Sequence, residues 1–357
     1  MSTKKIAVIG GGRWARVLIS VLTSLNCSIL WITKHGKANN LQWLQDQDFS
    51  NIEVTDDETS AFNRLTTKAI IVATQSHTHA NFIKKALLNN IPVLSEKPYS
   101  LHIEEADALI ALAEKNNVLA AVNFEFMYAD YLLQFKNKIS IIDIKQVQIT
   151  WHDPFKEKRH DEIKYSDIYT PLVHDSLPHC WSLFAEKLIF ESIDYQADSA
   201  LKIRATGNHK QFEFLLNRRA EKRIRYININ QGEAILDFSQ EPGFMIINKQ
   251  LINNKWVETR PLSASLHAFL NAVATDNRQL VNTLANCKNA VEIAQQAYNA
   301  LEIQIQQGIE LKAFSKQQEK NALYDYFIPK LMSEGQRIKA YTDEEIKQFL
   351  NTEHHFD

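Results

Sequence analysis

A short apolar strand that runs into three consecutive glycines constrains the fold of this chain more than any other feature. Residues 4–10 read Lys-Lys-Ile-Ala-Val-Ile-Gly, and residues 10–15 read Gly-Gly-Gly-Arg-Trp-Ala. Gly10, Gly12 and Ala15 therefore fit the pattern Gly-x-Gly-x-x-Gly/Ala. In this pattern the first glycine permits a tight turn, the second lets a pyrophosphate approach the backbone, and the small third residue lets helix and strand pack closely.

The segment that follows the glycines carries the apolar pattern of a helix. Its apolar residues recur with the i, i+3, i+4, i+7 spacing of one helix face. They are Trp14, Val17, Leu18, Val21, Leu22 and Leu25. The N-terminus of such a helix offers free N–H groups and a favourable dipole to anions, so we expect the cofactor phosphates there.

Short apolar strands alternate with helical segments through the next part of the chain. We expect strands at residues 28–33, 52–54, 68–74, 91–94 and 119–124, and helices at 78–90 and 102–117. Near-continuous apolar strands between amphipathic helices indicate a parallel sheet that is covered on both faces. The fold class is therefore predicted to be α/β, with a doubly wound Rossmann domain over residues 1–125.

The end of the second predicted strand indicates which dinucleotide is bound. An acidic residue there binds the ribose 2′-hydroxyl of NAD, whereas basic residues favour the 2′-phosphate of NADP. Residues 32–37 read Ile-Thr-Lys-His-Gly-Lys and contain no acid. Thr33 offers a hydroxyl and Lys34 or Lys37 a charge, and Arg13 lies on the same side. We therefore expect NADP in preference to NAD; the alternative is that these cations are solvated loop residues.

A charged pair ends the strand predicted at residues 91–94. Glu96-Lys97-Pro98 follows the apolar run directly, and such a pair is costly at the end of a buried strand unless it faces a cleft or a partner. Pro98 restricts the backbone of Lys97 as well as its own. Ligands of open α/β sheets bind beyond the carboxyl ends of the strands, so the pattern predicts a catalytic lysine at a cofactor cleft. The alternative is a charged surface turn.

Strands with strict alternation replace the parallel pattern after residue 125. Such half-exposed strands indicate a mostly antiparallel sheet. Their inward residues are Val147, Ile149 and Trp151; Leu201, Ile203 and Ala205; Phe212, Phe214 and Leu216; and Ala234, Leu236 and Phe238. Residues 126–310 are therefore predicted to form an α+β domain with an open-faced sheet that makes a homodimer or homotetramer interface.

Helices are expected to cover the other face of that sheet. The predicted helices are residues 172–186 and 264–275, and a third helix with an apolar stripe from Val291 is expected to stop at Gly308. Residues 311–357 are predicted to be a helical extension, in which Thr342 and Glu345 form a capping box.

A second group of chemically active residues lies in residues 174–179, which read His-Asp-Ser-Leu-Pro-His. Asp175 and His179 are four apart, so on a helix they share a face. A histidine beside a carboxylate can be held in one tautomer and exchange protons near neutral pH. A lysine in a desolvated cleft can have its pKa lowered towards the same range. The alternative is an ion pair on a helix surface, and Pro178 opposes a regular helix.

The chain resembles the Gfo/Idh/MocA oxidoreductases, which include glucose–fructose oxidoreductase and inositol dehydrogenase, over roughly residues 4–310. The resemblance rests on the order of four motifs: Gly10-x-Gly12-x-x-Ala15, Ala73-Thr74-Gln75-Ser76-x-x-His79, Glu96-Lys97-Pro98 and Asp175-x-x-Pro178-His179. It implies that Lys97 lies beside the nicotinamide and the reacting carbon. It further implies that His179 is the general acid/base, that Asp175 binds substrate or orients the histidine, and that Asn123 lies in the cofactor cleft.

These inferences predict an NAD(P)-dependent oxidoreductase that acts on a hydroxyl or carbonyl carbon of a sugar, nucleotide sugar or cyclitol. The expected catalytic residues are Lys97, Asp175 and His179, and the expected cofactor-binding residues are Gly10, Gly12, Arg13, Trp14, Ala15, Thr33, Lys34, Thr74, His79, Glu96, Lys97 and Asn123. The family often has glycine and aspartate where this chain has Leu177 and Ser182. These departures leave open a catalytically inactive sensor or scaffold, and an imine reductase is a further alternative.

Two histidine and arginine groups invite other interpretations. His77 and His79 suggest a metal site, but their place at a strand-to-helix turn favours backbone binding by His79, and we expect no metal. The cluster Arg218, Arg219, Lys222, Arg223 and Arg225 suggests a phosphate site. Since it spans a predicted hairpin, a solvated turn is favoured.

Composition bears on location and partners. The formal net charge of the 357 residues is -2, which gives no reason to expect nucleic acid or an anionic membrane as a partner. The chain enters a strand within four residues, so we expect no signal peptide, and no apolar run reaches membrane-spanning length. Three widely spaced cysteines suit a reducing compartment. We expect the protein in the cytoplasm.

Overall fold

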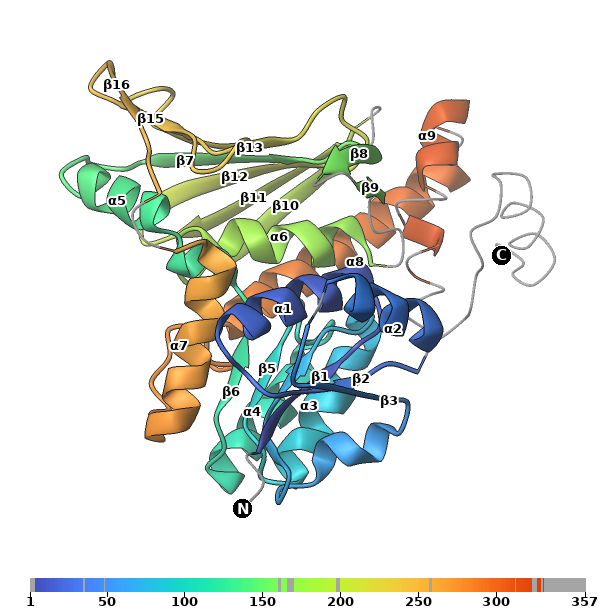
Figure 1. The fold of residues 1–357 in the computed structure, drawn as a ribbon. Helices are drawn as coiled ribbons and strands as arrows, with labels where there is room; N and C mark the ends of the chain where they lie inside the picture. The colour runs from blue at the N-terminus through green and yellow to red at the C-terminus, as the bar shows by residue number, and fades with distance from the viewer. Residues whose placement is uncertain are drawn as a thin grey trace.

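A six-stranded parallel sheet forms the centre of the first domain (Figure 1). Its strands lie in the order β3-β2-β1-β4-β5-β6, which is the order of a Rossmann fold and confirms the predicted fold class. The strands are β1 (Lys5–Ile9), β2 (Ile29–Ile32), β3 (Ile52–Thr55), β4 (Thr67–Val72), β5 (Val93–Ser95) and β6 (Ala120–Val122).

The computed structural model describes residues 4–34, 36–47, 49–159, 162–165, 170–196, 200–256, 259–311, 313–322, 326–328 and 330. The predicted capping box at Thr342 and Glu345 lies outside the described residues, as does most of the predicted C-terminal extension. Its described part includes helix α9 (Lys316–Ala322).

Helices cover both faces of the parallel sheet. They are α1 (Arg13–Ser24), α2 (Lys37–Asp46), α3 (His79–Leu88) and α4 (Ile103–Asn116), with short 3-10 helices η1 (Glu58–Phe62), η2 (Ser76–Thr78) and η3 (Glu125–Tyr128). Ile6 and Val8 of β1 pack in the same cluster as α1, whereas Ala7 and Ile9 pack with α3 and α4. Because both faces are covered, every position of the strand has to be apolar.

Helix α1 buries only part of the predicted stripe. Its buried residues are Ala15, Leu18, Ile19 and Leu22. Trp14, Val17 and Val21 instead line a cleft between the two domains. Leu18 and Leu22 of the predicted stripe are therefore buried, and Val17 and Val21 are partly buried against the same core. The prediction did not include Ala15 and Ile19, which are also buried.

An eight-stranded sheet forms the second domain, in the order β10-β11-β12-β7-β13-β14-β15-β16. Its pairs are antiparallel except for β12 and β7, as predicted for a mostly antiparallel sheet. The strands are β7 (Gln146–His152), β10 (Ile189–Tyr195), β11 (Leu201–Gly207), β12 (Lys210–Asn217), β13 (Ile224–Ile229), β14 (Ala234–Asp237), β15 (Phe244–Ile247) and β16 (Gln250–Asn253). Strands β8 (Lys156–Arg159) and β9 (Glu162–Tyr165) form a separate ribbon.

Two helices lie between the large sheet and the first domain (Figure 1). Helix α6 (Leu172–Ser182) packs against β7 and β12, and helix α8 (Lys288–Glu310) packs against α6, α4 and β10. Helix α5 (Asp130–Ile139) packs on η3 and β15. The side chains of the opposite sheet face are half-buried or exposed, as along Gln148 and Thr150 of β7.

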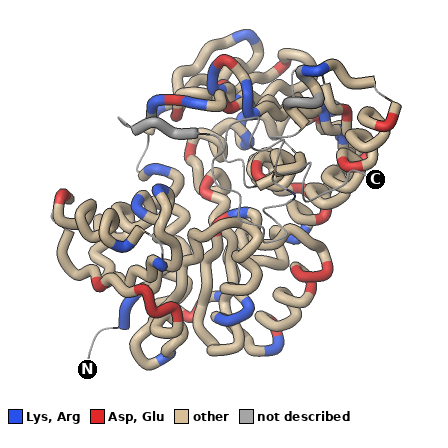
Figure 2. Tube along the Cα trace, turned by 90° about the vertical axis from the view of Figure 1, so that its right-hand side faces the viewer, with Lys and Arg blue, Asp and Glu red and all other residues tan. Residues whose placement is uncertain are grey.

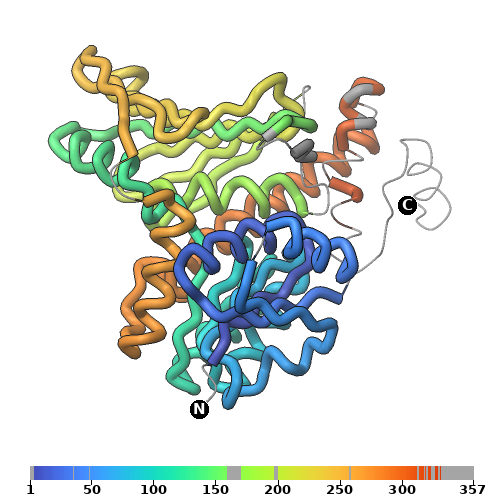
Figure 3. Tube along the Cα trace, in the orientation of Figure 1, coloured from blue at the N-terminus to red at the C-terminus, as the bar shows by residue number. Residues whose placement is uncertain are grey.

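Helix α7 (Pro261–Thr275) belongs to the packing of the first domain, so the prediction that it covers the second sheet was wrong. After β16 the chain returns to the first domain (Figure 3), where Leu266 and Phe269 share a buried cluster with Leu18 and Ile71. The apolar spacing of α7 predicts a helix correctly, but it does not identify the sheet that the helix covers. The expected end of α8 at Gly308 was also wrong, because the helix continues to Glu310.

None of the described helices combines the length and apolar character needed to cross a membrane.

We predict that Gly10→Ala lowers the free energy of unfolding by about 2 to 4 kcal/mol. Gly10 has φ of +143°, and a Cβ atom there would lie 2.2 Å from the carbonyl oxygen of Ala73, so the end of β4 would have to move. Urea denaturation of the protein without cofactor measures the loss.

Gly12→Ala is the matched control. Gly12 is the N-cap of α1 with φ of −84°, and a Cβ atom there would meet nothing within 4 Å. We expect its stability to change by less than about 0.5 kcal/mol. Equal losses in the two variants would contradict the account of this loop.

Candidate active site

A cleft of 1970 Å³ lies between the two domains. The first domain contributes Thr74, Glu96, Lys97 and Asn123, which follow β4, β5 and β6 at their carboxyl ends. The second domain contributes residues of β7, α6 and β13. Single-ligand pockets typically have about 300–1000 Å³, so this cleft has room for a dinucleotide and a second molecule together.

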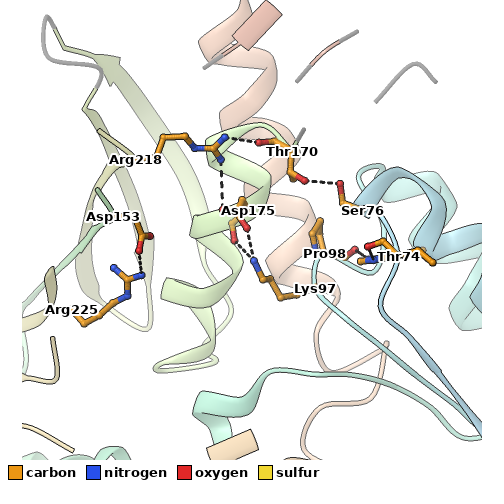
Figure 4. A network of polar contacts seen from close by, with 10 residues as sticks. Thr74, Ser76, Lys97, Pro98, Asp153, Thr170, Asp175, Arg218 and Arg225 are labelled. Carbon is orange, nitrogen blue, oxygen red and sulfur yellow. Dashed lines mark hydrogen bonds and ion pairs between the residues drawn. The ribbon is translucent and has the colours of Figure 1, made fainter. Parts of the chain in front are cut away.

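An ion pair between Lys97 and Asp175 joins the two domains at the centre of the cleft (Figure 4). Lys97 Nζ donates to Asp175 Oδ1 at 2.5 Å and to the carbonyl oxygen of Asp175 at 3.0 Å. The side chains are 14% and 28% exposed. Arg218 Nη2 lies 3.6 Å from the other carboxylate oxygen. The structure thus brings together two residues of the expected catalytic set that are 78 positions apart in the sequence.

Asp175 is held as a carboxylate. Burial opposes its ionisation, but the charges of Lys97 and Arg218 outweigh burial and hold the pKa of Asp175 well below its ordinary value. The carboxylate therefore keeps its charge throughout the neutral range and compensates the two cations that it contacts.

His179 is held by aromatic rings, although the sequence places the Asp175 carboxylate on the same helix face as a group that could orient the imidazole. The carboxylate of Asp175 accepts from Lys97, and the buried His179 Nδ1 has no hydrogen-bond partner among the described residues. The imidazole stacks on Trp151 with ring centroids 5.0 Å apart and an interplanar angle of 16°, and it meets Phe126 edge-on at 5.7 Å. Helix α6 continues through Pro178, so the two residues do share a helix. The Asp175 carboxylate binds Lys97 of the first domain, and not His179 of its own helix.

The imidazole of His179 is neutral near pH 7. Burial lowers the pKa of His179 well below its ordinary value, and the charge of Lys97 lowers it further, while Asp175 acts in the opposite direction. A neutral imidazole that faces a cleft can accept a proton.

Glu96 and Asn123 form a buried network that ties the cleft to the glycine loop. Asn123 Nδ2 donates to Glu96 Oε1 at 2.7 Å, and Ser265 Oγ donates to Asn123 Oδ1 at 2.8 Å. The indole of Trp14 also hydrogen-bonds Glu96. Burial raises the pKa of Glu96, while these donors act against the rise. The network connects α1, the end of β5, β6 and α7, so it fixes the floor of the cleft.

His79 is the first residue of α3 and binds backbone, as the sequence suggested. Its ring nitrogens are 2.8 Å from the carbonyl oxygen of Pro98 and 3.0 Å from that of Thr74. The imidazole therefore ties the segment that carries Lys97 to the neighbouring loop.

The residues expected to select NADP occupy different environments. Thr33 is fully buried and accepts a hydrogen bond from Asn40 Nδ2 at 2.9 Å, and Asn40 also donates to the carbonyl oxygen of Gly11. Thr33 and Asn40 thus support the glycine loop. Lys34 is exposed at the strand end, and Arg13 lines the cleft.

The basic cluster at residues 218–225 is not a solvated hairpin turn, so that prediction was wrong. Strands β12 and β13 do not pair with each other, because β7 lies between them. The connection therefore crosses the end of β7 and carries Arg218, Arg223 and Arg225 into the cleft. Arg218 and Arg225 are each 3% exposed.

Sequence reasoning missed the roles of Trp151 and Phe126 at the cleft. The alternation of β7 placed Trp151 on the inward face but gave no reason to separate it from the core. The available signal was its position as the last inward residue of the strand, where the sheet ends and the cleft begins.

Comparison with known proteins adds the following findings. Residues 4–124 match the Gfo/Idh/MocA family, an oxidoreductase family with an NAD-binding Rossmann fold, which confirms the resemblance for that segment. The glucose-6-phosphate 3-dehydrogenase of Bacillus subtilis (strain 168) is 25% identical over 218 residues, which cover 56% of this chain and 59% of that protein. The match thus spans less than two thirds of that relative.

Two solved structures share the fold of both domains. The UDP-N-acetylglucosamine 3-dehydrogenase of Acidithiobacillus ferrooxidans superimposes with a TM-score of 0.66 and 17% identity, covering 84% of this chain and 98% of that one. A 3-ketoreductase from Actinomadura kijaniata in complex with NADP and TDP-benzene gives a TM-score of 0.68 and 15% identity, with the same coverage.

We predict that Lys97→Met raises the pKa of His179, because the variant removes the charge that most disfavours the imidazolium after burial itself. In the unchanged protein the His179 Cε1–H signal stays in its neutral position as the pH falls to 6.5, its ordinary pKa. NMR titration with labelled histidine measures the pKa of His179 in the variant and in the unchanged protein, and the His179→Gln variant assigns the signal.

Lys85→Met is the control, because Lys85 pairs with Glu58 and does not line the cleft. It should leave the His179 titration unchanged. A pKa of His179 that falls in Lys97→Met would contradict the electrostatics described here.

Proposed function

We propose, on the premise that residues 4–124 belong to the Gfo/Idh/MocA family of oxidoreductases, that this protein is an NAD(P)-dependent dehydrogenase or reductase. It transfers hydride between nicotinamide and a hydroxyl or carbonyl carbon of a sugar, nucleotide sugar or cyclitol. The observation that carries this proposal is the meeting of Lys97, Asp175 and His179 at the carboxyl edge of the Rossmann sheet.

The glycine loop fits a dinucleotide. Gly12 leaves open space within 4 Å of where a Cβ would stand, directly at the N-terminus of α1, so a phosphate can approach the backbone there. Arg13, Trp14, Thr74 and Glu96 line the path from this loop to Lys97. A bound nicotinamide supplies or accepts the hydride.

The side chains at the centre of the cleft have distinct roles in the proposed reaction. In the direction of oxidation, the neutral imidazole of His179 takes the hydroxyl proton of the substrate. Lys97 Nζ stabilises the negative charge that develops on the same oxygen. Asp175 holds Lys97 in place and compensates its charge. In reduction, His179 returns the proton to the oxygen.

The relatives support a sugar as substrate. One is named for oxidising glucose 6-phosphate and another for oxidising UDP-N-acetylglucosamine, each at carbon 3. Both reactions remove a hydride and a proton from one secondary alcohol. Lys97 and His179 are suited to this reaction, because one stabilises the charge on the oxygen and the other accepts its proton.

We further propose that the half-buried face of the second sheet forms a homodimer or homotetramer interface. Leu215, Tyr226, Ile235 and Ile246 alternate with the inward residues of β12 to β15 and are half-buried in the single chain. A location in the cytoplasm remains part of the proposal. Cys27, Cys180 and Cys287 are free, in keeping with a reducing compartment.

We predict that Lys97→Ala abolishes turnover while leaving cofactor binding largely intact. The variant removes the charge beside the reacting oxygen, and oxyanion-stabilising groups contribute about 100- to 1000-fold to the rate. Steady-state kinetics and fluorescence titration with NADPH measure the two effects. Activity that persists within threefold of the unchanged protein would rule out the catalytic assignment.

We predict that NADP is preferred over NAD and that Lys34 contributes to the preference. Residues 32–34 at the end of β2 contain no acid, and the exposed Lys34 can pair with a 2′-phosphate. Lys34→Ala should lower kcat/KM for NADP by about tenfold and leave that for NAD unchanged. Lys37→Ala is the control, since Lys37 pairs with Asp56 at 3.0 Å. A preference of the unchanged protein for NAD would refute this part of the proposal.

A further inference from the structure

The connection between β12 and β13 places a group of cations in the substrate end of the cleft. Arg218, Lys222, Arg223 and Arg225 line the cleft, and we call them the arginine connection. Figure 2 shows basic and acidic residues interspersed over both domains, so this local grouping does not belong to a generally basic surface.

Arg225 is anchored at the inner end of the arginine connection. Its Nη2 donates to Asp153 Oδ1 at 2.6 Å (Figure 4), its Nη1 donates to the carbonyl oxygen of His152 at 2.6 Å, and its guanidinium lies 3.8 Å from the centre of the Trp151 ring. Arg225 Nε is buried and has no hydrogen-bond partner within the part of the chain that the structure describes. An unsatisfied buried donor is costly, and a ligand that accepts from it removes the cost.

Arg223 is partly buried close to Arg225. Arg223 directly precedes β13 and Arg225 is the second residue of that strand, and both side chains line the cleft. Burial lowers the pKa of Arg223 and the charge of Arg225 lowers it further. Two desolvated like charges repel each other. An anion bound between them is attracted to both, and this attraction offsets the repulsion.

Carboxylates share this end of the cleft but leave donors available. Arg223 Nη2 is 3.7 Å from Glu241, its ion-pair partner among the described residues, and this exceeds a hydrogen-bond distance. A guanidinium carries five N–H donors in a planar fork that matches two phosphate oxygens. Lys222 adds a mobile charge, since it is exposed at the outer end of the connection.

The arginine connection is close to the proposed site of hydride transfer. Arg218 contacts Asp175, which holds Lys97, and Trp151 lies under both Arg225 and His179. Arg223 and Arg225 therefore line the same cleft as Lys97 and His179, and Trp151 links Arg225 to the histidine.

We propose that the arginine connection binds a phosphate group of the substrate, which makes the substrate a phosphorylated sugar. This inference rests on the proposed function and narrows its substrate class. The shared chemistry is a sugar-linked phosphate, from either a sugar monophosphate or a nucleoside diphosphate sugar.

Paired substrates test the proposal. With NADP, kcat/KM is measured for glucose, glucose 6-phosphate and UDP-glucose, in the unchanged protein and in Arg223→Gln. We expect a phosphorylated member to exceed glucose by at least about 100-fold, and Arg223→Gln to reduce that advantage by about 10- to 100-fold, mainly through KM. A preference for glucose 6-phosphate indicates a sugar monophosphate as substrate, and a preference for UDP-glucose indicates a nucleoside diphosphate sugar.

Arg219→Gln is the matched control, because Arg219 lies in the same connection but does not line the cleft. It should keep the full advantage. Arg225→Lys provides a second test that retains the positive charge while losing the planar fork, and it should weaken the phosphorylated substrate by about tenfold. Equal kcat/KM for glucose and its phosphates, unaltered by Arg223→Gln, would overturn the inference and leave the proposed oxidoreductase function standing.

Binding separates the inference from the proposed function. Thermal unfolding in the presence of NADPH is followed with inorganic phosphate and with pyrophosphate. We expect at least one of them to raise Tm in the unchanged protein and in Arg219→Gln, and to lose this effect in Arg223→Gln. Such a result without turnover of any sugar would reject the proposed function and support the anion site. Equal Tm shifts in all three proteins, or no Tm shift in any of them, would reject the anion site.

Discussion

The ion pair between Lys97 and Asp175 is the interaction on which the rest of the site depends. Lys97 follows a fully buried strand, so its charge has to be compensated where the strand ends. The compensation comes from α6 of the other domain, and Arg218 extends it to the connection beyond β12. The ion pair that compensates the charge of Lys97 is therefore also a contact that joins the two domains across the cleft.

This arrangement changes how the histidine is held. With the carboxylate of Asp175 engaged by Lys97, the ring of His179 is oriented by Trp151 and Phe126. Burial, together with the charge of Lys97, lowers the pKa of His179 and keeps the imidazole neutral, while Lys97 is paired with Asp175. A neutral base and a cation in the same cleft are the two groups that removal of a proton from an alcohol requires.

Features set by local periodicity could be predicted from the sequence. The glycine loop, the alternation of strands and helices and the two-residue period of β7 and β12 led to the correct sheets, because each depends on neighbouring residues. Lys97, Asp175 and His179 were placed together through motif order and a family resemblance. Features that depend on long-range order could not be predicted. The burial of Arg223 and Arg225 follows from β7 lying between β12 and β13, and the position of α7 follows from the return of the chain to the first domain.

A crystal structure with NADP and a sugar substrate analogue bound tests the central claim most directly. The account predicts that the reacting oxygen lies within hydrogen-bond distance, about 2.6–3.2 Å, of both Lys97 Nζ and the His179 ring, with its carbon against the nicotinamide. A sugar bound in the cleft with its oxygens away from both residues would contradict the account.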